Sequence, residues 1–171
     1  MTEILHAWAL APAAIGTCCL AADRRRVRAP ELAASLLMLL AMLDSALGRM
    51  VAPVLWAALL LLGAMGLAAA GRRRGRASGV GNAMTLHSAI GMIAMAGLLL
   101  PMAHQAGGTT ASTAHAHGMS SATLIVALLA GSAVYAAGSV AAALRAHSWL
   151  DRAQYMAMGT STLVMGVALL G

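Results

Sequence analysis

Six stretches of mostly apolar residues, each long enough to cross a membrane as a helix, dominate this chain of 171 residues. A helix needs about 20 such residues to cross the hydrocarbon core of a bilayer. Hydrophobic residues make up 61% of the chain and charged residues only 9%, whereas an ordinary soluble domain carries about 25% charged residues. A chain this short cannot bury so much apolar surface in a water-soluble core. We therefore predict an all-α, polytopic integral membrane bundle.

The predicted bundle forms a single transmembrane domain over residues 1–171. Its six transmembrane helices are expected at residues 4–22, 31–48, 51–70, 84–104, 121–144 and 153–170. The segment 105–120 is rich in Gly, Ser and Thr, which predicts a flexible loop. The first helix is not typical of a signal peptide, because Glu3 precedes it and an arginine cluster follows it.

The arginine residues predict how the bundle is oriented. All 11 basic residues are arginines, and every one except Arg49 lies in the connections 23–30, 71–83 and 145–152. Cytoplasmic loops of membrane proteins carry an excess of Arg and Lys. We therefore expect these three connections in the cytoplasm, and both termini and the 105–120 loop outside.

The same arginines account for the formal charge of +6. In a soluble protein this charge would suggest a nucleic-acid partner, whereas here it marks helix ends, so we expect the lipid bilayer as partner and no nucleic acid. The chain has no Lys and is dominated by Ala, Gly and Leu, a composition typical of a GC-rich bacterial genome. The predicted location is therefore the bacterial plasma (inner) membrane.

Three of the predicted helices carry methionine and polar residues at helical spacing. Residues at i, i+4, i+7 and i+11 share one helix face. These stripes comprise Glu31, Ser35, Met38 and Met42 in the second helix, His87, Gly91, Met95 and Met102 in the fourth, and Met158, Thr162 and Met165 in the sixth. Thioether and imidazole ligands suit a soft cation, most naturally Cu(I). Methionine also fills gaps between packed helices, so simple packing is an equally open interpretation.

The outer loop contains a second set of candidate ligands. The run "HAHGM" places His115, His117 and Met119 close together, and Met102 and His104 lie near the end of the preceding helix. His-x-His beside Met suits Cu(I), Cu(II) or Zn(II). A flexible loop has to be ordered when it binds, which predicts a capture site of modest affinity. The alternative is a solvated loop with incidental histidines.

Haem is a further alternative, because bis-histidine ligation needs two histidines on different helices at similar depth. The candidate pairs are His6 with His104 and His87 with His147. The sequence contains no nucleophile–base pair, no glycine-rich phosphate loop and no triad pattern. We therefore predict no catalytic residues.

Three segments resemble a family of actinobacterial polytopic membrane proteins with His/Met-rich helices. They are "LLMLLAML" from residue 36, "LHSAIGMIAMAGLLLPM" from residue 86 and "AQYMAMGTSTLVMG" from residue 153. The resemblance implies a membrane bundle, and no function is assigned to that family. The spacing of Met38 and Met42 and the outer His/Met run are also similar to features of copper-transport proteins.

Two functional hypotheses follow. The first is binding or transport of a soft metal, copper, by the His and Met residues named above. The second is a non-catalytic structural or accessory subunit of a larger membrane complex, with other membrane subunits or further copies of the chain as partners. The first predicts that Met38, Met42, Met95 and Met158 turn toward one common axis, and the second predicts that they scatter among separate helix contacts.

Overall fold

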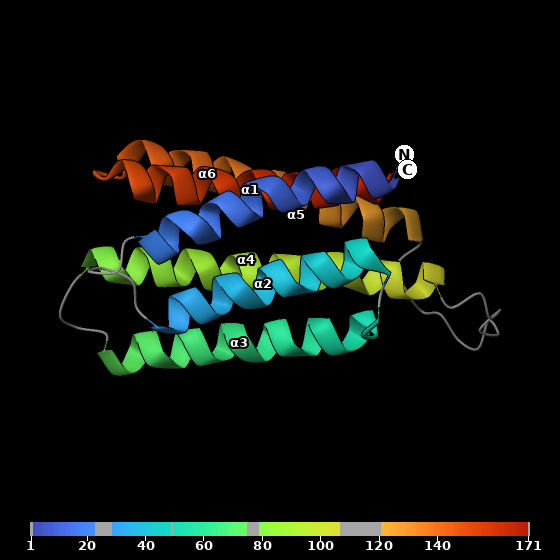
Figure 1. Ribbon diagram of the computed structural model, residues 1–171, viewed down its shortest axis with the longest axis horizontal. Coiled ribbons are helices and arrows are strands. Elements are labelled where there is room, and N and C mark those ends of the chain that lie inside the picture. Colours follow the sequence, from blue (N-terminus) through green and yellow to red (C-terminus); the bar gives the residue numbers. More distant parts are fainter. Residues whose placement is uncertain (1, 23–28, 49, 75–78, 107–120, 171) are drawn as a thin grey trace.

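The computed structural model describes residues 2–22, 29–48, 50–74, 79–106 and 121–170, which form six helices (Figure 1). The helices are α1 (Thr2–Ala22), α2 (Ala29–Leu47), α3 (Pro53–Arg74), α4 (Gly79–Ala106), α5 (Ser121–Arg145) and α6 (Trp149–Ala168). The prediction of an all-helical bundle with six helices is confirmed. The largest difference from the predicted bounds is the start of α4, which begins at Gly79 and not at residue 84.

Local signals explain where several helices begin and end. Gly48 follows α2 with a φ of 135°, a backbone conformation that favours glycine. Pro53 occupies the first position of α3, where its missing N–H leaves no helical hydrogen bond unmade. Ser148 caps α6, since its side-chain oxygen accepts a hydrogen bond of 3.0 Å from the backbone N–H of Asp151.

Asp44 holds the tight connection between α2 and α3. Its carboxylate accepts hydrogen bonds from the backbone N–H groups of Met50 at 3.1 Å and Val51 at 3.3 Å. It also accepts one from the indole N–H of Trp56 at 2.8 Å. The carboxylate thus satisfies backbone donors in the connection and ties it to the first turns of α3.

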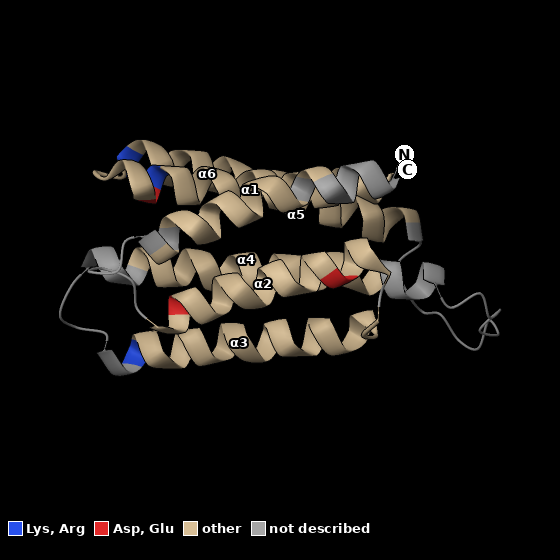
Figure 2. Cartoon of the chain, in the orientation of Figure 1, with Lys and Arg blue, Asp and Glu red and all other residues tan. Residues whose placement is uncertain are grey.

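The helices run lengthwise beside one another, and consecutive helices alternate in direction (Figure 1). α1 begins and α6 ends at the same end of the bundle. The stretches coloured blue as Lys or Arg lie at the opposite end (Figure 2), where α3 ends with Arg72 in its last turn, α5 ends at Arg145 and α6 begins before Arg152. We call this the arginine end. The helix ends on either side of the three arginine-rich connections also lie there, as the alternation of six helices predicts. Which end faces the cytoplasm stays a prediction.

Four of the helices are long and apolar enough to cross a membrane. By length and composition, the spans are Ala29–Leu47, Pro53–Arg72, Ala83–Pro101 and Ala122–Arg145. Over the described residues, α1 contributes a shorter apolar segment, Leu10–Cys19. α6 carries Asp151, Arg152 and Gln154 near its start, which reduces its hydropathy. The chain therefore has the architecture of a multi-pass membrane protein, and the crossing of the bilayer by α1 and α6 stays a prediction.

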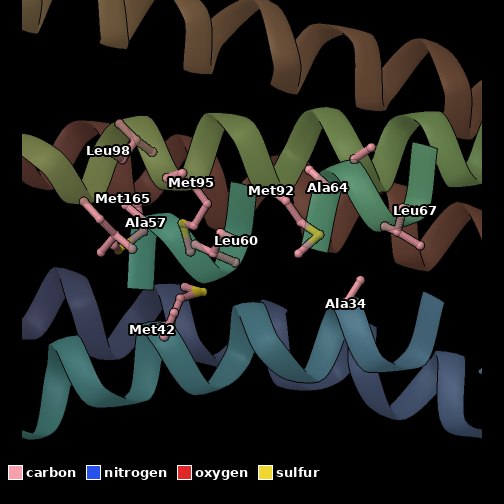
Figure 3. Packing of buried hydrophobic residues seen from close by; sticks show 14 of the residues in the cluster. Ala34, Met42, Ala57, Leu60, Ala64, Leu67, Met92, Met95, Leu98 and Met165 are labelled. Atoms are coloured by element: carbon pink, nitrogen blue, oxygen red, sulfur yellow. The ribbon is translucent and has the colours of Figure 1, made fainter. Parts of the chain in front are cut away.

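The core lies between the helices that carry the methionine stripes. α3 packs mainly on α4, and α6 packs on both α1 and α5. Met42, Met95 and Met165 belong to the buried apolar cluster, together with leucines and alanines of α3 and α4 (Figure 3). The opposite face of α2, with Leu36 and Leu40, is exposed. For the stripe residues whose side chains the structure describes, the predicted inward orientation is confirmed.

Candidate functional site

Side chains from five of the six helices line a partly open cavity of about 40 Å³. Its wall is formed by Ala13, Gly16 and Thr17 of α1, Ser35, Met38, Leu39 and Met42 of α2, Gly91 and Met95 of α4, Tyr135 of α5, and Gln154, Ala157, Met158, Ser161 and Thr162 of α6. A single water needs about 10–15 Å³ by a comparable measure. The cavity therefore has room for a small ion or a few waters.

Four thioether side chains from three helices line this cavity. Met38 and Met42 come from α2, Met95 from α4 and Met158 from α6. Met42 and Met95 point into the space between their helices (Figure 3) and are 2% and 3% exposed. All four line the same cavity, as the metal-binding hypothesis expects. Their helical spacing explains this result, because each lies on the face that its helix turns to the core.

Three of the hydroxyl groups in the wall donate their hydrogens to carbonyls of their own helices. Thr17 donates to the carbonyl of Ala13 at 2.9 Å, Ser161 to Ala157 at 2.8 Å and Thr162 to Met158 at 2.9 Å. Each hydroxyl carries one hydrogen, so the lone pairs of these oxygens remain as acceptors. Together with the thioethers, they make the wall rich in electron-pair donors, a property that suits a cation.

Gln154 is the one carboxamide in the wall. Its side chain is only 3% exposed, and its Nε2 has no hydrogen-bond partner in the described part of the chain. A buried amide without a partner costs roughly 1–3 kcal/mol. Carboxamide oxygen and nitrogen exchange places by rotation about the terminal torsion. Gln154 can therefore meet a polar occupant with either atom. Sequence analysis missed this residue, although it lies four positions before Met158 and so shares its helix face.

The wall described here contains no charged side chain and no histidine or cysteine. Among the described residues, no group of three or more His, Cys, Asp or Glu side chains is placed to hold a metal ion. Divalent zinc sites use such ligands. The cavity, which has a neutral and sulfur-rich wall, instead matches a soft monovalent ion.

His87 lies next to this cavity but does not line it, and it packs between two tyrosines. Its ring stacks on Tyr135 with centroids 4.7 Å apart and an interplanar angle of 19°, and it meets Tyr155 edge-on at 4.8 Å. Its Nε2 lies 3.2 Å from the Oγ of Ser139. Met95, another candidate ligand of this helix, lines the cavity, whereas His87 packs beside the wall against two tyrosines.

Glu31, the acidic residue of the α2 stripe, is buried in the first turn of α2, which begins at the arginine end of the bundle (Figure 1). Its Oε1 accepts a hydrogen bond of 2.8 Å from the hydroxyl of Thr85 in α4. This bond joins α2 to α4 and satisfies a carboxyl group that would otherwise be costly in a membrane interior.

The remaining candidate ligands are not placed by the structure. His115, His117 and Met119 lie outside the described residues, as do the side chains of His6, Met102 and His104, although α4 includes the last two positions. His147 is exposed in the turn between α5 and α6. His87, by contrast, is packed between Tyr135 and Tyr155.

Comparison with known proteins finds no match to a family model, to a curated protein or to a solved structure. The functional argument therefore rests on the chemistry of the cavity.

Proposed function

We propose that this chain is a multi-pass membrane protein that binds a soft monovalent transition-metal ion, Cu(I), in the methionine cavity. The observation that carries the proposal is the convergence of Met38, Met42, Met95 and Met158 on one small cavity. Thioether sulfur prefers Cu(I) to hard cations such as Mg²⁺ or Ca²⁺. A neutral wall also fits a single positive charge better than a double one, since burying charge in an apolar interior is costly.

The accessory-subunit hypothesis requires no such convergence. If methionine served only as packing material, its thioethers would be expected to fill gaps between pairs of helices. Met92 has this role, because its terminal methyl group contacts the site of Gly63 in α3. Met42 and Met95 belong to the same buried cluster as Met92, but unlike Met92 they also line the cavity, as Met38 and Met158 do.

Cu(I) binding is tested by titrating purified protein in detergent micelles with Cu(I) against a competing chelator. The test variant is Met38→Leu/Met95→Leu/Met158→Leu, since leucine conserves side-chain volume and the fold should be kept. The control is Met65→Leu/Met156→Leu, because both side chains are exposed, at 68% and 45%.

We expect wild type and the control to bind one tight equivalent of Cu(I), and the triple variant to bind it at least tenfold more weakly. Circular dichroism and gel filtration check that all three proteins fold alike. Equal affinity of the triple variant and the control would contradict the proposal.

A further inference from the structure

We propose that His87 is a second binding station for the same soft ion, on the arginine-end side of the methionine cavity, and that Tyr135 separates the two stations. This inference rests on the proposed function, because it concerns where the ion goes after the cavity. It follows from the hydrogen bonds of His87, from the position of Tyr135 and from the polarity of the two sides of the cavity.

Ser139 lies between the carbonyl of Tyr135 and the ring of His87. Its hydroxyl lies 2.9 Å from the carbonyl of Tyr135, to which it donates, and its Oγ lies 3.2 Å from the Nε2 of His87, a contact whose donor depends on the tautomer of the ring. In the proposal the proton is on Nε2, which then donates to the Oγ of Ser139. With this tautomer the lone pair of the neutral imidazole lies on Nδ1, and within the described residues no hydrogen bond occupies it.

This arrangement is typical of a histidine that binds a metal. Metal-ligating histidines almost always donate their second ring N–H to a neighbouring oxygen, which determines the tautomer and the ring orientation. Ser139 provides that oxygen, and Tyr135 and Tyr155 hold the ring in place. Imidazole is a suitable ligand for copper, and in the proposal the Nδ1 nitrogen supplies one ligand of a transient station.

Tyr135 contacts both stations. Its ring stacks on His87, and it also lines the methionine cavity. Its hydroxyl lies against Gly91, where any Cβ would overlap with it. His87 precedes Gly91 by four residues, which is about 6 Å along a helix. In the proposal, an ion that moves from the cavity to His87 passes the Tyr135 side chain, which contacts both.

The two sides of the cavity differ in polarity. Toward the arginine end lie His87, Tyr155 and the hydrogen-bonded pair of Glu31 and Thr85. Toward the other end, α4 and α6 present Leu98, Leu99 and Met165, all at most 1% exposed and part of the apolar cluster. Polar groups lower the cost of moving a charge through the interior. The route from the cavity therefore leads to the arginine end.

The test uses full-length protein in which the five other histidines, His6, His104, His115, His117 and His147, are replaced by Ala. This background leaves His87 as the one imidazole. Ag(I) serves as a redox-inert probe for Cu(I), and the ¹⁵N resonances of the labelled histidine are followed while one and then two equivalents are added. We expect the first equivalent to leave the imidazole unchanged and the second to shift Nδ1 while Nε2 stays protonated.

Two variants complete the design. In the same background, Ser139→Ala should lower the affinity for the second equivalent of Ag(I) about tenfold. This is the usual effect of removing the hydrogen-bond partner of a metal-ligating histidine. Met38→Leu/Met95→Leu/Met158→Leu should remove the first equivalent and keep the Nδ1 shift. If one equivalent of Ag(I) binds and the Nδ1 resonance of His87 never shifts, the proposal of a second station is wrong and the proposed function stands. The same conclusion follows if Nε2 loses its proton. If no Ag(I) binds, both are wrong.

Discussion

Tyr135 of α5 places its hydroxyl group against Gly91 of α4, in the space that a side chain at position 91 would fill. This contact joins α5 to the wall of the methionine cavity and brings the tyrosine ring onto His87. The hydroxyl makes a long hydrogen bond of 3.4 Å to the carbonyl of His87, so its position depends mainly on packing. Gly91 is therefore a structural requirement of the site.

Replacing Gly91 by Ala should destabilise the fold by roughly 1–3 kcal/mol, because the new Cβ overlaps with the Tyr135 hydroxyl. The double variant Gly91→Ala/Tyr135→Phe should recover part of this loss, since it removes the overlapping oxygen. Gly131→Ala is the matched control, because nothing lies within 4 Å of a Cβ built there. Thermal unfolding in detergent measures all three, and an unchanged midpoint for Gly91→Ala would argue against this packing.

The connection between α2 and α3 depends on the hydrogen bonds that the Asp44 carboxylate accepts, and their contribution to the free energy of unfolding can be measured. Asp44→Ala should cost roughly 1.5–3 kcal/mol, since it removes an ionised acceptor and leaves the Trp56 indole N–H unpaired. A double-mutant cycle with Trp56→Phe should give a coupling energy of about 1 kcal/mol or more. Trp149→Phe, whose side chain is 71% exposed, serves as the control. Additive effects of Asp44→Ala and Trp56→Phe would show that this bond contributes nothing.

The orientation of the bundle in the membrane is tested with single cysteines. The background is Cys18→Ala/Cys19→Ala, which removes both native thiols. Met50→Cys lies at the end opposite the arginine end and is 94% exposed, and His147→Cys is exposed at the arginine end. In intact bacterial cells that express the protein, an impermeant maleimide should label position 50 readily and position 147 only after permeabilisation. The reverse pattern would overturn the predicted topology.

The outer His/Met run has a test of its own, because it lies outside the described residues. If the loop captures Cu(I), His115→Ala/His117→Ala should lower the amount of weakly bound Cu(I) at neutral pH and leave the tight equivalent unchanged. Unperturbed histidine is largely protonated below about pH 6 and cannot then bind metal. The difference between wild type and variant should therefore disappear as the pH falls. Equal weak binding at neutral pH would show that the loop is only solvated.

Much of the fold follows from the sequence for simple physical reasons. Apolar length predicts helices in a bilayer, and helical periodicity predicts which face each helix turns inward. This is why the buried positions of Met42 and Met95 could be expected before the structure. The alternation of six helices likewise places all three arginine-rich connections at one end.

The site could be predicted only in part. Helical periodicity predicts which side chains share one face of a helix, but it does not predict which other helices pack against that face. Sequence analysis grouped His87 with Met95 as ligands of one stripe, whereas packing against Tyr135 and Tyr155 sets His87 apart from the cavity. Gln154 and Tyr135 were missed, since their role depends on which helices meet. The α1 contribution to the wall was missed for the same reason, because Gly16 and Thr17 belong to no methionine stripe.

X-ray absorption at the copper edge of protein loaded with one equivalent of Cu(I) tests the central claim most directly. The four-methionine cavity predicts a first coordination shell dominated by sulfur, and loss of the sulfur signal in Met38→Leu/Met95→Leu/Met158→Leu. A first shell of nitrogen or oxygen alone, or no copper retained after gel filtration, would contradict it.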